Sequence, residues 1–126
     1  MKFYIASRFA RIPDVRKITE TIEGMGHDVS FDWTQHKSLV PYKNNSVLAK
    51  EYAIVDVKGV LDCDVFILLT DIAGTGMYVE FGIALALNIK TGSPKIFVVG
   101  NHDNCSFYYH PNVVLKNTVE EVLEEL

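Results

Sequence analysis

Short, continuous apolar runs alternate along the chain with segments in which apolar residues recur every three or four positions. Residues 65–69 are five apolar residues in a row, which is too short for a helix and typical of a strand buried on both faces of a parallel sheet. Residues 28–33 show an alternating pattern instead, with Val29, Phe31 and Trp33 on one face. Together the patterns predict five strands, at residues 3–6, 28–33, 65–69, 95–99 and 113–115.

Four helices are predicted between and after these strands. The first begins at Pro13 and is stopped by the glycines at 24 and 26, and the second spans 46–62 with Ser46 as its N-cap. The third follows a glycine turn at 74–76, and the fourth follows an Asn117-x-x-Glu120 capping arrangement. The expected buried stripes are Val15, Ile18, Ile22 and Met25; Leu48, Tyr52 and Val55; Val79, Ile83 and Leu87; and Val119, Val122, Leu123 and Leu126.

Strands that alternate with helices predict an α/β fold. The expected architecture is a three-layer, doubly wound, five-stranded parallel sheet of the flavodoxin-like or Rossmann-like kind, in the order 2-1-3-4-5. Residues 1–126 should form a single domain, because 126 residues at 48% hydrophobic content suffice for one core. Ligands bind such sheets where the strand order reverses, at the carboxyl ends of the first and third strands. Ser7, Arg8 and Asp71 follow those ends and are expected at the cleft.

The net charge of the chain indicates which class of ligand it binds. The chain has 16 acidic and 12 basic side chains, a formal net charge of -4, whereas a protein that binds a nucleic-acid backbone normally carries a basic patch. We therefore expect a small-molecule ligand and no nucleic acid. No stretch reaches the roughly 18 apolar residues of a membrane span, and the N-terminal residues show no signal-peptide pattern. A cytoplasmic protein without a membrane partner is expected.

Cysteine and histidine give no sign of a metal or disulfide framework. Cys63 and Cys105 are too few for a disulfide scaffold and are predicted to be free thiols. His102, Cys105 and His110 match no zinc-binding spacing. We predict no metal and no cofactor.

The candidate chemistry lies between the third strand and the third helix. Gly74, Thr75 and Gly76 allow a tight turn, and the helix N-terminus after them offers free N–H groups to an anion. Glu80 is then unexpected, because its carboxylate would repel such an anion. Two explanations stand side by side: Glu80 favours the helix dipole from the first turn, or it takes part in chemistry. The segment GTGMYVEFG lacks the GK[ST] ending of a P-loop and the GxGxxG spacing of a dinucleotide site.

Three motifs over nearly the whole chain resemble the nucleoside 2-deoxyribosyltransferase family, including its nucleotide N-glycosidase branch. Tyr4 stands in YIASRF where the family has a tyrosine, Asp56 precedes Asp64 by the family's eight residues, and Glu80 ends the glycine-containing loop. The resemblance implies that Glu80 attacks the anomeric carbon of a deoxyribose and forms a glycosyl ester. It also implies that Tyr4 orients Glu80 and that Asp56 binds or protonates the base.

The same resemblance leaves the substrate open. Transferases of the family carry Asp, and its nucleotide hydrolases Ser, at the position of Gly74, so a deoxynucleoside and its 5′-monophosphate both remain possible. The acceptor, water or a second base, is open as well. In the family a neighbouring subunit completes each site. The resemblance therefore implies a homo-oligomer in which residues 100–110 contribute Asn104 and Ser106, and the aromatic residues 107–109 are expected to anchor the interface.

Two other classes of protein compete with an enzyme that cleaves or exchanges the N-glycosidic bond. A non-catalytic nucleotide-binding or sensing module on the same fold would not need Tyr4, Asp56 and Glu80 together. A flavodoxin-like electron carrier would need a Thr/Ser-rich phosphate cradle after the first strand, and that cradle is missing. The polar segment 34–45 is long enough to be a lid over the base.

Overall fold

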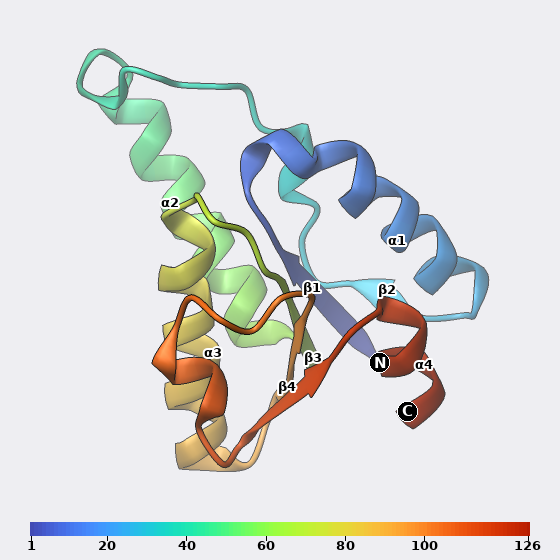
Figure 1. The fold of residues 1–126 in the computed structure, drawn as a ribbon. Coiled ribbons are helices and arrows are strands. Elements are labelled where there is room, and N and C mark those ends of the chain that lie inside the picture. Colours follow the sequence, from blue (N-terminus) through green and yellow to red (C-terminus); the bar gives the residue numbers. More distant parts are fainter.

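The computed structural model describes all residues, 1–126, as a parallel sheet between two layers of helices (Figure 1). The strand order is β2-β1-β3-β4-β5, and every neighbouring pair is parallel, which confirms the predicted fold. The strands are β1 (Lys2–Ala6), β2 (Asp28–Val29), β3 (Val65–Leu69), β4 (Lys95–Val99) and β5 (Val113–Lys116); the helices are α1 (Ile12–Gly24), α2 (Ser46–Asp62), α3 (Gly76–Thr91) and α4 (Val119–Glu125).

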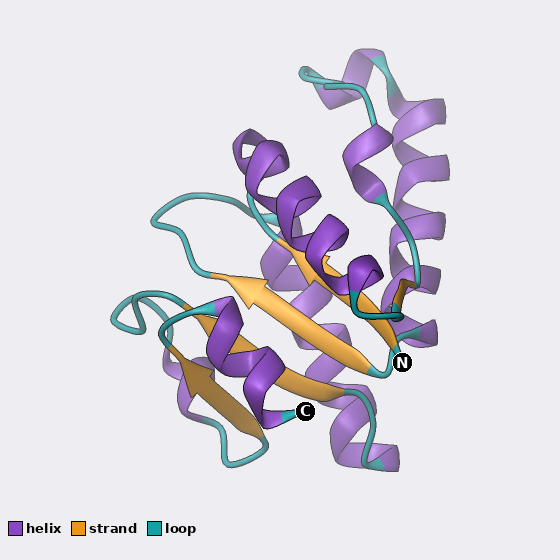
Figure 2. Ribbon diagram, turned by 90° about the vertical axis from the view of Figure 1, so that its right-hand side faces the viewer, coloured by secondary structure: helices purple, strands orange, loops and turns teal.

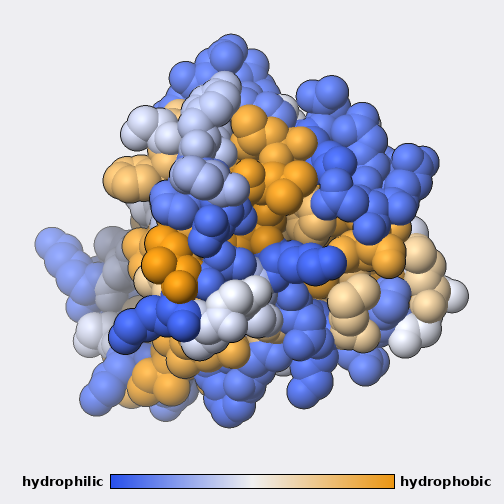
Figure 3. Space-filling model, turned by 90° about the horizontal axis from the view of Figure 1, so that it is seen from below, coloured by the Kyte–Doolittle hydropathy of each residue, from blue (hydrophilic) through white to orange (hydrophobic).

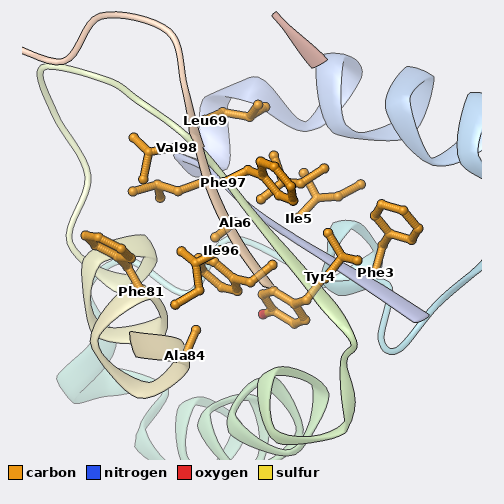
Figure 4. Packing of buried hydrophobic residues seen from close by; sticks show 14 of the residues in the cluster. Phe3, Tyr4, Ile5, Ala6, Leu69, Phe81, Ala84, Ile96, Phe97 and Val98 are labelled. Carbon is orange, nitrogen blue, oxygen red and sulfur yellow. The ribbon is translucent and has the colours of Figure 1, made fainter. Parts of the chain in front are cut away.

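The two faces of the sheet are covered by different helices. Helices α1 and α4 lie on one face and α2 and α3 on the other (Figures 1 and 2). Successive side chains of a strand point to opposite faces, so Phe3 and Ile5 lie on one side and Tyr4 on the other, together with Phe81 and Ala84 of α3 (Figure 4). The strand β1 therefore presents Tyr4 to the layer that carries α2 and α3.

The second strand is shorter than predicted. Only Asp28 and Val29 pair with β1, and the chain leaves the sheet at Ser30, whose hydroxyl donates to the carbonyl of Gly59 at 2.6 Å. Trp33 lies in a 3-10 turn and donates its indole N–H to the carbonyl of Ile5 at 2.6 Å. Local side-chain hydrogen bonds have thus replaced the ladder that the alternation predicted.

The predicted face of α3 is also wrong. The helix buries Met77, Phe81, Ala84 and Leu85, whereas Val79 is 64% exposed. Apolar residues surround most of this helix, so periodicity alone cannot identify the face that packs on the sheet.

Both predicted caps are displaced by one residue. Asn45 precedes α2, and Ser46 is already its first helical residue. At α4 the cap is Thr118, whose hydroxyl accepts from the backbone N–H of Glu121 at 3.2 Å.

The surface mixes polar and apolar residues. Figure 3 shows one side of the molecule, on which apolar patches are separated by hydrophilic side chains. None of the helices combines the length and apolar character that crossing a membrane requires.

Candidate active site

A cavity of about 550 Å³ opens where α2, the start of α3 and the end of β1 meet. Ser7, Arg8, Asp56, Thr75 and Glu80 line it, from three separate segments of the chain. The segment after β2 closes another side. Further lining residues include Trp33, His36, Leu39, Tyr42, Tyr52, Gly74 and Gly76. The position agrees with the rule that places ligands at the reversal point between β1 and β3.

Glu80 and Tyr4 are hydrogen-bonded at the base of this cavity. Tyr4 is fully buried, and its hydroxyl donates to Oε2 of Glu80. Burial raises the pKa of Glu80 to about 8, although the Tyr4 hydrogen bond acts in the opposite direction. Burial, together with the neighbouring Glu80, also holds the pKa of Tyr4 far above its usual value, so its hydroxyl stays protonated. Tyr4 thus holds one oxygen of the Glu80 carboxyl group and leaves the other without this partner, an arrangement that can supply a nucleophile.

Glu80 does not occupy the first turn of its helix, contrary to the prediction. Helix α3 begins at Gly76, so Glu80 is its fifth residue, and the first turn holds no acidic side chain. Stabilisation by the helix dipole falls off within the first turn. The dipole therefore gives little reason for a half-buried carboxylate at this place.

Asp56 reaches the cavity from α2 and is paired with a residue that sequence analysis missed. Nε2 of His36 lies 2.8 Å from Oδ1 of Asp56. Burial raises the pKa of Asp56, while the hydrogen bond from His36 lowers it in part. Asp56 is close enough to Glu80 and Tyr4 to raise the pKa of both electrostatically. Tyr4, Glu80, Asp56 and His36 thus form one interacting cluster.

The turn before α3 offers polar groups to the opposite end of a ligand. Gly74 has a φ of 109°, a conformation that side chains other than glycine rarely adopt. Thr75 caps α3 without a side-chain hydrogen bond, which leaves N–H groups of the first turn free for an anion. Arg8 lines the same part of the cavity and lies 3.8 Å from Asp71, measured from Nη1 to Oδ1.

Three predicted binding residues do not reach this cavity within the subunit. Asp71 lines a different cavity, and its carbonyl accepts from Asn104 at 2.8 Å and from Tyr78 at 3.1 Å. Ser106 is exposed at the start of a 3-10 turn (Ser106–Tyr109). Asn104 therefore braces the loop after β3 in its own subunit.

Gly59 was not singled out from the sequence, yet it sets the position of Tyr4. A Cβ atom at Gly59 would lie 2.8 Å from Cε2 of Tyr4 and 2.7 Å from Cβ of Phe31. Helix α2 can approach the Tyr4 ring only because this residue has no side chain. No pattern in the sequence marks Gly59, since one glycine inside an apolar helix has no characteristic spacing.

We predict opposite effects for alanine at two helical glycines. At Gly82 nothing lies within 4 Å of the added carbon, so Gly82→Ala should gain up to about 1 kcal/mol of helix propensity. At Gly59 the same gain is outweighed by overlap with Tyr4, and Gly59→Ala should lose about 1–3 kcal/mol. Denaturant unfolding of both variants beside wild type measures the difference. An equally stable Gly59→Ala protein would contradict the close packing.

A second cavity, of about 860 Å³, lies on the α1 and α4 side of the sheet. It is lined by side chains of both charges, among them Arg11, Lys17, Asp14, Asp71 and Glu120. The structure holds no cluster of three or more His, Cys, Asp or Glu side chains arranged for a metal ion. His102 instead has its Nε2 3.0 Å from the carbonyl oxygen of Val98.

Comparisons with known proteins bear on the fold alone. No family model and no curated protein matches the sequence. Among solved structures, the chain is similar to the CMP N-glycosidase BcmB of Clostridium botulinum, with a TM-score of 0.63 and 18% sequence identity. The similarity covers 99% of this chain and 97% of that one, so the two share their whole fold.

Proposed function

We propose that the protein is an enzyme that breaks the N-glycosidic bond of a nucleoside or nucleotide. The observation that carries the proposal is the Glu80 carboxylate, held by buried Tyr4 in a cavity that Asp56 also lines. A binding module gains nothing from a desolvated carboxylate beside an anion site. The solved relative in fold is itself a CMP N-glycosidase, which supports this chemistry.

In the proposed reaction Glu80 is the nucleophile. Its free oxygen forms a bond to the anomeric carbon while the C–N bond breaks and its electron pair leaves with the base. The transition state resembles an oxocarbenium ion, which a nearby carboxylate stabilises before bonding to it. Asp56 supplies the proton that the departing base takes up. Water then attacks the glycosyl ester, loses a proton, and regenerates the Glu80 carboxylate.

We favour a 5′-monophosphate substrate. Arg8 and the free N–H groups at the start of α3 lie on the wall that would face the 5′ end of a sugar whose anomeric carbon is at Glu80. Deoxyribosyl transfer between bases is the second candidate. It uses the same covalent intermediate, and a ring nitrogen of a second base replaces water as the acceptor.

A homo-oligomer with shared sites is part of the proposal. Tyr108 cannot anchor an interface as expected, because it is fully buried, although Phe107 and Tyr109 are exposed. A second apolar surface lies on α2, where Val47, Ile54 and Leu61 are exposed seven residues apart. This stripe lies next to the cavity, so a second copy packed there would close its open side.

We expect light scattering at tens of micromolar protein to give at least a dimer. A lysine in place of Ile54 puts a charge into the apolar stripe and should shift the protein toward monomer with reduced activity. Met25, the C-cap of α1, is exposed and not buried as predicted; it is the matched control, and Met25→Lys should leave the assembly intact. A fully active wild-type monomer would refute the shared site.

The experiment that tests the function is a substrate panel. The protein is incubated with ribo- and deoxynucleosides and their 5′-monophosphates, each with and without a second free base, and released and newly formed compounds are separated by chromatography. Release of the base from a 5′-monophosphate in the absence of a second free base supports the hydrolase. A new nucleoside formed only with a second base supports transfer. No cleavage of any compound would refute both.

Trp33 should report binding. It lines the cavity at the root of segment 34–45, and its indole N–H donates to the end of β1. We expect its fluorescence to change on titration with a bound nucleotide, because the lid folds over the base beside it. An unchanged spectrum at saturating ligand would contradict closure of the lid.

A further inference from the structure

His36 stands in the cavity wall with no role in the chemistry described so far. It ends the 3-10 turn η2 (Trp33–Gln35), which is fixed at several points: Trp33 bonds to β1, Thr34 bonds to Asp32, and Arg16 of α1 donates to the carbonyl of Thr34 at 3.0 Å. His36 is therefore held by a turn that is hydrogen-bonded at several points.

The ring of His36 is also fixed by stacking. It lies parallel to Tyr52, with 3.7 Å between ring centroids and 18° between planes, and Phe31 lies 5.5 Å away. The hydroxyl of Tyr52 accepts from the backbone N–H of Lys37 at 3.2 Å, which ties the stack to the same turn. This packing leaves Nε2 of His36 aimed at Oδ1 of Asp56.

The groups around His36 and Asp56 explain why a proton shared between these two side chains would serve the departure of the base. Asp56 faces Tyr4 of β1 and Glu80 of α3, and neither is the acid of the proposed reaction, because the Tyr4 hydroxyl donates to Glu80 and the Glu80 carboxylate is the nucleophile. Arg8 and Lys37 are the other charged side chains that line the cavity. His36 is the side chain hydrogen-bonded to Asp56, so it is the group placed to return a proton to the Asp56 carboxylate directly.

We propose that His36 and Asp56 share one proton, which passes from Nε2 of His36 through the Asp56 carboxyl group to the leaving base. Asp56 touches the base, and His36 is a positioning residue that acts through it; the inference rests on the proposed function. In balance, one proton moves: it leaves Nε2 of His36, is bound by the Asp56 carboxyl group, and is taken up by the base nitrogen that keeps the C–N electron pair. Asp56 is left as a carboxylate and His36 as a neutral imidazole with its remaining hydrogen on Nδ1. The water that hydrolyses the glycosyl ester returns a proton to the pair.

The test compares two leaving groups on the same sugar. One substrate is the nucleotide cleaved fastest in the panel, and the other carries 4-nitrophenolate, which departs without a proton. In the His36→Gln variant, the side-chain amide can still donate to Asp56 but cannot release a proton, and in His36→Ala the donor is lost. Both variants should lose about 100-fold in kcat on the nucleotide and stay within about threefold of wild type on the nitrophenyl substrate.

Each other outcome contradicts a distinct part of the proposal. Full activity of His36→Gln on the nucleotide would show that His36 only orients Asp56 and would overturn proton supply. Equal losses of kcat on both substrates would show that the substitution distorts the site, and they would also overturn proton supply by His36. Glu80→Gln must fail on both substrates; if it does not, the glycosidase itself is refuted, and with it this role of His36. His27→Gln, just before β2 at the amino-terminal end of the strands, is the control.

Discussion

Replacing Glu80 with glutamine is expected to lower turnover by at least roughly three orders of magnitude while the protein still folds and binds its substrate. The amide keeps the shape of the side chain and can still accept from Tyr4, but it cannot form a glycosyl ester. Single-turnover base release and nucleotide binding, measured on the same preparation, separate the two effects. Near-normal turnover in the Gln variant would end the assignment of Glu80 as nucleophile.

The same substitution is expected to raise the stability of the folded protein at high pH, although it lowers turnover. The pKa of Glu80 is raised from 4.5 to about 8 in the folded protein, so the folded state binds more protons than the unfolded chain between these values. Wild-type stability from this group must therefore fall as the pH rises from about 4.5 to about 8. Glu80→Gln should gain thermal stability relative to wild type at pH 9 and not at pH 4. A helix-dipole role predicts a loss of about 0.3–1 kcal/mol at the higher pH instead.

Replacing Asp56 with asparagine should lower kcat on natural bases by about 10²–10⁴-fold, because the amide cannot protonate the leaving group. The 4-nitrophenyl substrate should be cleaved almost as fast as by wild type. Steady-state kinetics on both substrates provide the test, and Asp62→Asn, near the far end of the same helix, is the matched control. A loss that appears mainly in KM, and equally on both substrates, would assign Asp56 to binding alone.

The fold could be predicted because its strands carry strong local signals. The apolar runs at β3 and β4 have one reasonable interpretation each, and five strands alternating with helices through right-handed connections favour the order 2-1-3-4-5 that the structure has. The extent of β2 could not be predicted in the same way. Its alternating pattern was genuine, but Ser30 and Trp33 form hydrogen bonds to Gly59 and to β1 that no local pattern contains.

The candidate site was predictable where motifs exist and not where partners come together only in space. Glu80 was singled out from the glycine turn before it, and Tyr4 and Asp56 from the family resemblance; the structure brings the three into one cluster. His36 stands 20 residues from Asp56 in a polar segment, and Gly59 sits inside an ordinary helix. Their contributions depend on which side chain faces which across the cavity, and this follows from the packing of α2 against β1.

The most direct test of the central claim is mass spectrometry of wild-type protein quenched with acid during turnover of the substrate found in the panel. A glycosyl ester on Glu80 adds the mass of the sugar, with its phosphate where the substrate is a monophosphate, to the peptide that contains this residue. We predict that the adduct appears in wild type and is absent from Glu80→Gln. Steady base release with an unmodified Glu80 peptide, or an adduct on another residue, would contradict the account.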